Sequence, residues 1–443
     1  MKRTFARIFC IVTFCVSAVG TQGQIISTIA GNGSNAYSGD NGLAIGSGLS
    51  NPQGVAIDKG GNVYVADKNN HRIRKIDVYG TITTVAGTGA AGYNGDRIPA
   101  VAARLYWPTG VAVDDGGNLY IADYQNKRIR MVDSTGIIHT LIGNGSTGLG
   151  QENVKADTSA MDAPLCIALD KYRNVYFSDG IYSRIRKINH DDGMVKTIIG
   201  NTVQQATGDG GPASAACVNR PGGMAFDKWG NLYFSETYSN YIRKIDTNNI
   251  VHKVAGDGEF GFKGDGGSAL LAEMRYPYGI CIDDTGNVYF SDVNNNRIRK
   301  IDTAGIIQTF AGTGSQGYSG DGGDAINARF NLPYYLALDQ YGNMVVTEKD
   351  GFVRYIFIQK VNNINSKIDI FPNPATGLFH VLLKSDYEEP VTIFFTDERG
   401  QKAKELVTVT NRIITVQMLA GGVYVINGVS KHNKWNGKVS VTR

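Results

Sequence analysis

Six aromatic residues flank three prolines of this 443-residue sequence, and aromatic rings in such positions could bind a ligand. They are Tyr106, Trp107, Tyr276, Tyr278, Tyr334 and Tyr335. Exposed aromatic rings stack on sugars or grip peptides, because each ring offers a large apolar area together with a polar handle. Packing between structural units is the alternative explanation for these rings. We therefore treat the six residues as a hypothetical ligand-binding site.

The sequence gives weaker support for a catalytic or metal-binding site than for a ligand-binding site. The six histidines fall at unrelated positions, and the sequence has no nucleophile elbow and no H-E-x-x-H pattern. Aspartates recur in Tyr-x-Gly-Asp segments such as 37–40 and 93–96. Ca²⁺ needs six or more oxygens around one point, whereas these aspartates are spread along the chain, so we expect Asx turns that fix long loops. We expect no bound cofactor, and Ca²⁺ is the alternative that the aspartates suggest.

Basic Arg-x-Arg tracts, such as 72–75 and 297–300, could indicate binding to nucleic acid. The net charge is only +4, and Lys2, Arg3 and Arg7 lie in a segment that we expect to be removed. A nearly neutral chain lacks the electrostatic footprint of a nucleic-acid-binding protein. An acidic residue ends the strand before each tract, as Asp67 does, so we predict that acid and arginine pair within each structural unit. We expect no nucleic-acid partner.

An internal repeat organises these positions. Prolines recur at a spacing of 56 or 57 residues, and a turn asparagine and a loop glycine keep the same register. The prolines are Pro52, Pro108, Pro164, Pro221, Pro277 and Pro333. Three markers with one period indicate six copies of a single supersecondary unit.

Each copy is predicted to contain four short strands. In the first copy the segments 54–58, 63–67, 72–77 and 81–86 are rich in β-branched and aromatic residues and are separated by Gly or Asn turns. Four-stranded units repeated in this way are blades, so the fold class is an all-β, six-bladed β-propeller. The sixth copy lacks a fourth strand, whereas 25–30 has the fourth-strand pattern. We predict that this N-terminal strand closes the last blade and removes its unpaired edge.

The motifs of these copies resemble the NHL repeat. The first copy contains Gly54-Val-Ala-Ile-Asp58 and Asn70-His-Arg-Ile-Arg-Lys-Ile76, and all six copies match over about residues 25–358. The resemblance implies a propeller but no single activity, because some members bind proteins or RNA and some related propellers are lyases or lactonases. Lactonase-like propellers place acidic and amide residues where the innermost strands begin. Here those positions form a poor metal cage, consisting of Gln53, Thr109, Leu165, Gly222, Tyr278 and Tyr334.

The repeat stops after Ile356, and a different pattern follows. Residues 359–367 are typical of a polar linker, and residues 368–443 of a small β-sandwich. The segments Phe371-Pro-Asn-Pro-Ala-Thr-Gly377 and Leu419-Ala-Gly-Gly-Val-Tyr424, with a basic last strand, resemble the C-terminal sorting domain of the type IX secretion system of Bacteroidetes. This resemblance implies export across the outer membrane, followed by release or surface attachment. An ordinary β-sandwich module is the alternative.

The first 23 residues are typical of a signal peptide. Basic residues precede the apolar segment 8–19, and the small residues Ala18 and Gly20 mark a cleavage site. No other stretch is apolar enough over a sufficient length to span a membrane. The expected domains are a signal peptide at 1–23, a propeller at 24–358, a linker at 359–367 and a sorting domain at 368–443. We expect a monomer, secreted or on the outer-membrane surface of a Gram-negative bacterium.

These observations favour a secreted or cell-surface binding or scaffold protein that recognises a protein or a polysaccharide on one propeller face. Its other expected partner is the export machinery, through the C-terminal domain. The alternative is a propeller enzyme of the lyase or lactonase type with its site at the central channel, because catalytic residues can come from separate blades. We favour binding because the sequence contains no recognisable catalytic set.

Overall fold

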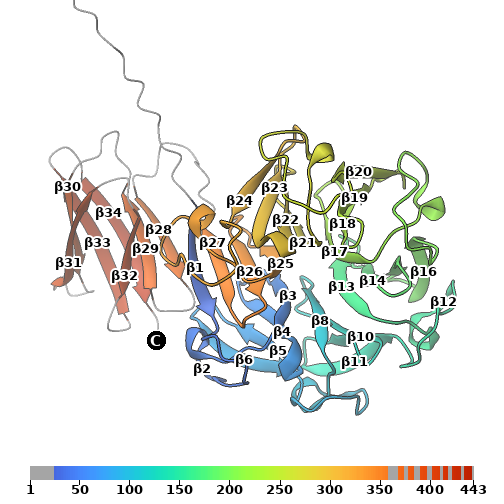
Figure 1. Ribbon diagram of the computed structural model, residues 1–443. Helices are drawn as coiled ribbons and strands as arrows, with labels where there is room; N and C mark the ends of the chain where they lie inside the picture. Colours follow the sequence, from blue (N-terminus) through green and yellow to red (C-terminus); the bar gives the residue numbers. More distant parts are fainter. Residues whose placement is uncertain are drawn as a thin grey trace, which may run out of the picture.

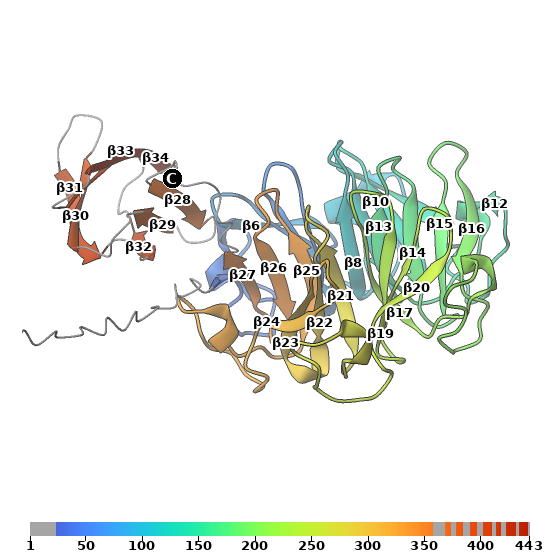
Figure 2. The ribbon, with the colours of Figure 1, turned by 90° about the horizontal axis from the view of Figure 1, so that it is seen from above.

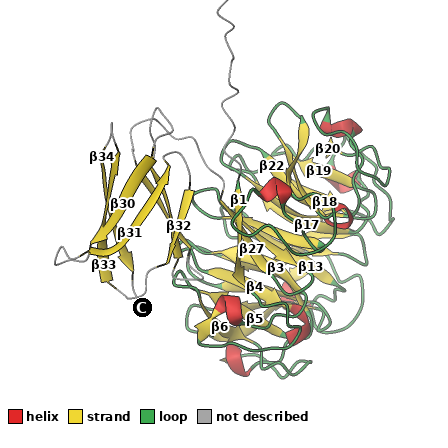
Figure 3. Ribbon diagram, turned by 60° about the vertical axis from the view of Figure 1, so that its left-hand side comes forward, coloured by secondary structure: helices red, strands yellow, loops and turns green. Residues whose placement is uncertain are grey.

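The computed structural model describes residues 24–357 throughout and, beyond them, the strands between 368 and 441. Residues 24–357 fold into six antiparallel sheets arranged as a ring (Figure 1). Figure 3 shows strands joined by loops, with only short helical turns (red). The predicted signal peptide and linker lie outside the described residues, so the proposed domain boundaries stay predictions.

Each blade contains the four strands that the repeat predicts. The first blade consists of β3 (Pro52–Ile57), β4 (Val63–Asp67), β5 (Arg72–Ile76) and β6 (Thr81–Ala86). The second consists of β8 (Pro108–Val113), β9 (Leu119–Asp123), β10 (Arg128–Val132) and β11 (Ile137–Ile142). The third consists of β13 (Pro164–Leu169), β14 (Val175–Asp179), β15 (Arg184–Ile188) and β16 (Met194–Ile199).

The other three blades have the same order. The fourth consists of β17 (Pro221–Phe226), β18 (Leu232–Glu236), β19 (Tyr241–Ile245) and β20 (Val251–Ala255). The fifth consists of β21 (Pro277–Ile282), β22 (Val288–Asp292), β23 (Arg297–Ile301) and β24 (Ile307–Ala311). The sixth consists of β25 (Pro333–Leu338), β26 (Met344–Glu348), β27 (Val353–Phe357) and β1 (Ile25–Ala30).

The first strands of the blades surround the axis. Each lies next to the first strand of the following blade, in the order β3, β8, β13, β17, β21 and β25, and β25 returns to β3. In Figures 1 and 2 these strands lie towards the middle of the ring and β16 lies at its rim. Neighbouring first strands approach closely, because a Cβ atom on Gly223 would lie 2.2 Å from the carbonyl oxygen of Tyr278. Glycine is therefore required at this contact.

The predicted closure of the ring by the N-terminal strand is confirmed. Strand β1 pairs antiparallel with β27, with Ile26 opposite Ile356 and Thr28 opposite Arg354. Figure 1 shows the blue β1 beside the orange β27. Ile26 is fully buried, so closure is stabilised by apolar burial as well as by the strand hydrogen bonds.

The long loops between blades contribute structure that the repeat does not predict. The two-residue strands β2 (Gly42–Leu43), β7 (Ile98–Pro99) and β12 (Val154–Lys155) pair with β6, β11 and β16. Each of these loops therefore adds a short strand along the outermost strand of the blade that comes next in the sequence. Short 3-10 turns lie in the interblade loops at η1 (Ala44–Gly46), η3 (Ala100–Ala102), η4 (Ala156–Thr158), η5 (Ala213–Ala215), η6 (Ala269–Leu271) and η8 (Ala325–Asn327). Two more lie between second and third strands, at η2 (Lys68–Asn70) and η7 (Val293–Asn295).

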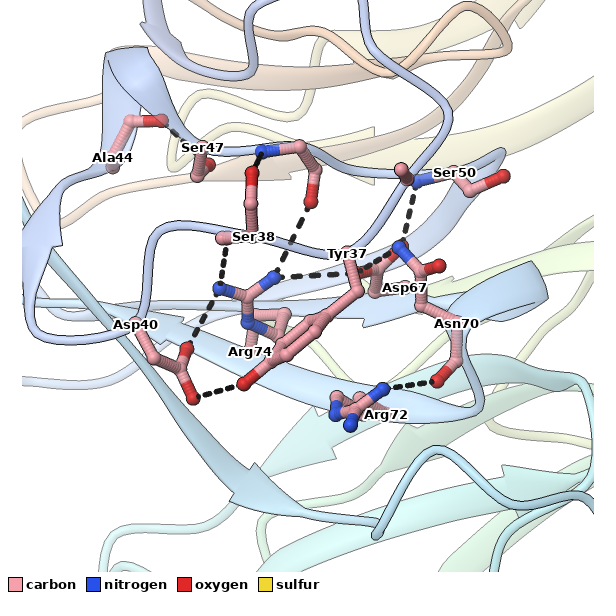
Figure 4. Close-up of polar contacts among 12 residues, drawn as sticks. Tyr37, Ser38, Asp40, Ala44, Ser47, Ser50, Asp67, Asn70, Arg72 and Arg74 are labelled. Carbon is pink, nitrogen blue, oxygen red and sulfur yellow. Dashed lines mark hydrogen bonds and ion pairs between the residues drawn. The ribbon is translucent and has the colours of Figure 1, made fainter.

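One buried arginine in each blade fixes the loop to the sheet, as Figure 4 shows for the first blade. The guanidinium of Arg74 is completely buried and lies 3.4 Å from the carboxylate of Asp67 and 2.7 Å from that of Asp40. The hydroxyl of Tyr37 donates a 2.8 Å hydrogen bond to Asp40, and the Tyr37 ring lies 4.8 Å from the Arg74 guanidinium. The corresponding fully buried arginines are Arg130, Arg186, Arg243, Arg299 and Arg354.

These contacts confirm one prediction and correct another. The acid that ends each second strand does pair with an arginine of its own blade. The sequence predicts an Asx turn for the aspartate of the Tyr-x-Gly-Asp segment, and this prediction is wrong for Asp40. Instead, Asp40 pairs with Arg74, because the preceding loop brings its carboxylate to the charge inside the blade. A buried guanidinium needs such partners, since an unpaired buried charge is strongly destabilising.

The described strands of the C-terminal region form two antiparallel sheets. One contains β28 (Ile368–Asn373), β29 (Leu378–Leu383) and β32 (Ile413–Gln417). The other contains β31 (Lys402–Val409), β30 (Pro390–Thr396), β33 (Gly422–Ser430) and β34 (Lys434–Val441). Two sheets of this kind agree with the predicted β-sandwich.

Candidate ligand-binding face of the propeller

The candidate site lies on the side of the ring where the six first strands begin, which we call the proline face. The turns between second and third strands lie on the same side, because each opening proline pairs with the acid that ends the second strand, as Pro52 does with Asp67. All six aromatic residues that the sequence suggests for binding flank opening prolines. The proline face is therefore built from interblade loops and second-to-third-strand turns.

The residue before each opening proline has a left-handed backbone, with φ between 48° and 57°. These residues are Asn51, Trp107, Ala163, Arg220, Tyr276 and Leu332. Such a backbone costs a non-glycine residue about 1–2 kcal/mol, and a following proline further restricts the residue. The surrounding structure must therefore hold the strained backbone in place.

Hydrogen bonds from the preceding blade provide this support at four of the six positions. The amide of Trp107 donates to Nδ1 of His71 at 3.1 Å, and the amide of Tyr276 donates to Oδ1 of Asn240 at 3.2 Å. Because Nδ1 accepts, the neutral His71 ring carries its proton on Nε2, and burial lowers the pKa of this imidazole. His71 is thus a neutral positioning group for Trp107. The equivalent acceptors for Arg220 and Leu332 are Ser183 and Asn296.

A first group of side chains surrounds Lys68 on the first two blades. The Lys68 ammonium lies 5.7 Å from the ring centre of Trp107 and 6.0 Å from that of Tyr124. Tyr106 packs edge-on against Trp107, with 5.6 Å between ring centres. Trp107 is 37% exposed, so this group combines a cation with aromatic surface that a ligand can reach.

A second group surrounds Arg220 on the fourth and fifth blades. The Arg220 guanidinium lies 4.8 Å from the ring centre of Tyr238. The ring centres of Tyr238 and Phe260 each lie 5.8 Å from that of Tyr276. Tyr238 and Phe260 are 47% and 59% exposed, so this group also combines a cation with exposed rings.

The two cations differ from the fully buried arginines, all of which form ion pairs. Lys68 and Arg220 are half-buried, and neither side chain has a hydrogen bond or an ion pair within residues 24–357. Burial and, after it, the positive charge of Arg220 lower the pKa of Lys68. The positive charge of Arg220, in the fourth blade, thus disfavours the charged form of Lys68, in the first blade.

The remaining aromatic residues form a third group at the axis. The ring centre of Tyr278 lies 6.2 Å from that of Tyr334 and 5.1 Å from that of Tyr335. Tyr335 is buried, and its hydroxyl donates a 2.8 Å hydrogen bond to the carbonyl oxygen of Leu165. Burial raises the pKa of Tyr335 and raises that of the Cys166 thiol to about 12. Tyr335 is therefore packed inside the ring, whereas Tyr278 and Tyr334 are half-buried.

The structure thus divides the six predicted residues among three groups instead of gathering them into one. Sequence reasoning missed the two cations and the exposed rings of Tyr238 and Phe260. Arg220 stands in the same register as Trp107 and Tyr276, directly before an opening proline. Lys68 directly follows the acid that ends its second strand. An alignment of the six copies, position by position, could have found both.

The opposite side of the ring also carries exposed rings, on turns between first and second strands. Tyr172, Trp229 and Tyr341 are 67%, 55% and 68% exposed. Lys171 and Lys228 lie over the first two of these rings, at 5.1 Å and 4.7 Å from the ring centres. These residues resemble the proline-face groups in composition, and they provide matched controls for experiments.

Among the described residues, no group of three or more His, Cys, Asp or Glu side chains could hold a metal ion. The helical segments within the described ranges are all too short or too polar to cross a lipid bilayer.

Family models match three parts of the chain. The NHL repeat model matches residues 49–76, and the teneurin NHL domain model matches residues 89–152 and 261–318. The secretion system C-terminal sorting domain model matches residues 369–442. The last match covers the predicted sorting domain, so the chain is a secreted or cell-surface protein.

Curated relatives share the repeat region. The chain is 27% identical to teneurin-4 of Mus musculus over 77% of this chain and 13% of that protein. It is 28% identical to NHL repeat-containing protein 2 of Gallus gallus over 63% of this chain and 42% of that protein. The chain therefore spans less than half the length of these relatives.

Solved structures show the same fold. A structural genomics protein of Bacteroides thetaiotaomicron is 21% identical, with a TM-score of 0.57 and coverage of 76% of both chains. An auxiliary nutrient binding protein of Bacteroides ovatus is 14% identical, with a TM-score of 0.56 and coverage of 76% of this chain and 78% of that chain. With the repeat register, the closed ring and the family matches, the chain is an NHL-repeat six-bladed β-propeller with a secretion system C-terminal sorting domain.

Proposed function

We propose that this chain is exported by a type IX secretion route in a Gram-negative bacterium of the Bacteroidetes and binds a protein or a polysaccharide on its proline face. The observation that carries this proposal is the placement of exposed aromatic rings beside unpaired cations on that face. Trp107 and Tyr276 stand in equivalent positions of two blades, on a backbone that is held in a strained conformation. The same backbone recurs before all six opening prolines, so the repeat itself holds these two side chains at equivalent places on the face.

The fold comparison supports the same class of function. Two solved propellers of Bacteroides with TM-scores of 0.55 and 0.56 are described as auxiliary nutrient binding proteins. Their sequence identities to this chain are 18% and 14%, so they do not identify a ligand. A binding role also suits an exported protein whose blades differ mainly in the residues that flank the opening prolines.

Two double variants of the full chain test the binding face. Trp107→Ala with Tyr276→Ala removes rings from the proline face, and Tyr172→Ala with Trp229→Ala removes exposed rings from the opposite face. We expect the first pair to lose binding on a glycan array or in a pull-down from the native environment, and the second pair to bind as the parent does. Equal binding by all three proteins would overturn the assignment to the proline face. Cleavage of a bound glycan or lactone would instead support the lyase or lactonase alternative.

The export route has its own test. Mass spectrometry of the culture medium and of outer-membrane fractions should detect the propeller outside the cell. We expect peptides from the region beyond about residue 366 to be missing from the mature protein, as is common for proteins with this sorting domain. A chain found only in the cytoplasm would contradict the proposed route.

A further inference from the structure

We propose that His71 is the positioning residue that holds Trp107 in its binding position at neutral pH, and that protonation of His71 in acid releases Trp107 and weakens ligand binding on the proline face. This inference rests on the proposed binding function and adds a dependence on pH to it. An exported protein is exposed to the pH of its surroundings, so this dependence affects where the protein binds.

The contact between His71 and Trp107 joins two blades. His71 follows the second-strand end of the first blade, and Trp107 precedes the opening proline of the second. The backbone amide of Trp107 donates a 3.1 Å hydrogen bond to Nδ1 of His71. The His71 ring also lies edge-on to the ring of Tyr106, with 5.5 Å between ring centres. One imidazole therefore contacts both aromatic residues that directly precede Pro108.

This hydrogen bond requires the neutral imidazole. The amide can only donate, so Nδ1 must carry a lone pair. A proton on Nδ1 would face the amide proton of Trp107, donor against donor, and the hydrogen bond would be lost. The backbone of Trp107 is left-handed, with a φ of 53°, and a non-glycine residue keeps such a backbone only where its surroundings support it. Loss of the His71 contact should therefore let Trp107 move.

The equivalent positions of other blades show that an acceptor which does not titrate can provide the same support. Asn240 and Asn296 accept hydrogen bonds of 3.2 Å and 3.1 Å from the amides that precede the next opening prolines. Both have the left-handed backbone of His71, with φ of 53° and 49° against 54°. Of the side chains at this position in the six blades, only histidine ordinarily changes its charge between pH 5 and 8. The other three are Lys127, Ser183 and Gly351.

The cations around His71 favour its neutral form. Burial and, after it, the positive charge of Arg72 lower the pKa of His71 from its ordinary value of 6.5. Lys68, whose ammonium lies 5.7 Å from the ring centre of Trp107, is a second cation of the site. Arg104, in the interblade loop that leads to Trp107, is exposed. Because the folded pKa lies below the unfolded value, the contact is complete above about pH 6.5 and is lost as the pH falls through the folded pKa.

Two buried carboxylates near this site determine which control the test needs. Asp67 accepts a 2.9 Å hydrogen bond from Asn70, and burial raises the pKa of this carboxyl. Asp123 accepts a 2.7 Å hydrogen bond from the amide of Tyr106, and burial raises its pKa to about 6. Both groups can therefore titrate in the same range as His71. A transition of Trp107 in acid belongs to His71 only if it disappears when His71 alone is replaced.

Fluorine NMR of the full chain labelled with 5-fluorotryptophan tests the contact without a ligand. The chain has three tryptophans, Trp107, Trp229 and Trp435, so the spectrum contains three signals, and Trp107→Phe assigns the relevant one. We expect the Trp107 signal to shift through one transition below pH 6.5, which the signal of Trp229 on the opposite face does not follow. Far-UV circular dichroism should stay constant over the same range, because the ring remains folded.

Two substitutions at His71 copy residues that other blades already have. His71→Asn keeps an acceptor that does not titrate, as in the fourth and fifth blades, and should abolish the transition of the Trp107 signal. His71→Gly removes the acceptor, as in the sixth blade, and should place this signal near its acid position at every pH. A transition that persists in His71→Asn would belong to Asp67 or Asp123 and would overturn the inference. A Trp107 signal of the parent that does not change with pH would overturn it as well.

Binding measurements connect the contact to function. The glycan array is read at pH 7 and at one pH unit below the folded pKa of His71, and its strongest binder is titrated in solution at both pH values. At the lower pH about one molecule in ten keeps the neutral ring, so the apparent affinity of the parent should fall about tenfold. The affinity of His71→Asn should be the same at both pH values.

The inference and the proposed function fail in different ways. Equal binding of the parent at both pH values, together with loss of binding in Trp107→Ala with Tyr276→Ala, would overturn the inference and leave the proposed function intact. If that double variant binds as the parent does, the proposed function fails, and the role of His71 in ligand binding fails with it. The fluorine signal of Trp107 separates these cases, because it reports the contact with His71 whether or not a ligand binds.

Discussion

The hydroxyl of Tyr335 in the sixth blade donates a 2.8 Å hydrogen bond to the carbonyl oxygen of Leu165 in the third blade. These blades face each other across the axis, because β25 lies between β21 and β3 whereas β13 lies between β8 and β17. Tyr335 stands where four other blades have glycine and the third has Cys166. One side chain therefore connects opposite sides of the ring and occupies the axis at this level.

Two variants that remove this contact should destabilise the propeller to different degrees. Tyr335→Phe loses one buried hydrogen bond and should cost about 1 kcal/mol of unfolding free energy. Tyr335→Ala also leaves a cavity and should cost about 3–5 kcal/mol. Urea unfolding followed by intrinsic fluorescence measures both changes. Tyr341→Ala, at a ring that is 68% exposed, should unfold like the parent; an equally small effect of Tyr335→Ala would show that the axis contact does not stabilise the ring.

Substituting the buried arginine of a blade should lower the free energy of unfolding more than substituting its acidic partner in the loop. Arg74→Met leaves the buried carboxylate of Asp67 without its guanidinium, and removing one partner of a buried pair costs about 3–5 kcal/mol. Asp40→Asn keeps a hydrogen-bond acceptor at a partly exposed site and should cost about 1 kcal/mol. Unfolding free energies of the two single variants check this order. The reverse order would mean that the interblade loop, and not the sheet, depends on Arg74.

The architecture of the ring could be predicted because three markers repeat with one period. The closing strand 25–30 was predictable for the same reason, since it carries the fourth-strand pattern that the sixth copy lacks. The partner of Asp40 was not, because Arg74 lies 34 residues further along the chain and the two meet only through the fold. A repeat pattern gives the register of a residue but not its contacts outside the repeat.

The candidate site was predictable only in part, for a related reason. The sequence placed aromatic residues beside the opening prolines, and the structure puts those prolines on one face of the ring. It did not distinguish Tyr335, which is buried at the axis, from Trp107, which reaches solvent. Nor did it single out Lys68 and Arg220, which stand out only when the six copies are aligned position by position. In the fold, Lys68 contacts the ring of Trp107 and Arg220 contacts that of Tyr238, and these contacts could not be predicted from the sequence.

Closure by the N-terminal strand predicts a strong effect of a single residue near the start of the propeller. Ile26 is fully buried opposite Ile356, so Ile26→Ala should cost about 2–5 kcal/mol of stability. Ile26→Asp should cost more, because it buries an unpaired charge. The measurement is the urea midpoint together with protection of β27 amides from hydrogen exchange. Ile45→Ala, at a side chain that is 38% exposed, is the control; unchanged protection of β27 in Ile26→Asp would contradict closure by β1.

The turn aspartate Asp283 should make part of the stability of the ring depend on pH. Burial alone would raise the pKa of Asp283, but hydrogen bonds from Asn287 and Thr285 outweigh it, so the folded pKa lies below the ordinary value of about 3.9. A depressed folded pKa means that the unfolded chain binds the proton more readily, so this contribution to stability is complete above about pH 4 and is lost as pH falls through the folded pKa. Asp283→Asn should therefore cost about 1–2 kcal/mol at pH 7, and the difference from the parent should shrink in unfolding measurements at pH 3. Asp284→Asn, at the exposed neighbouring position, should follow the parent at every pH. A difference between Asp283→Asn and the parent that stays constant from pH 7 to pH 3 would show that the amide contacts, and not the charge, provide the stabilisation.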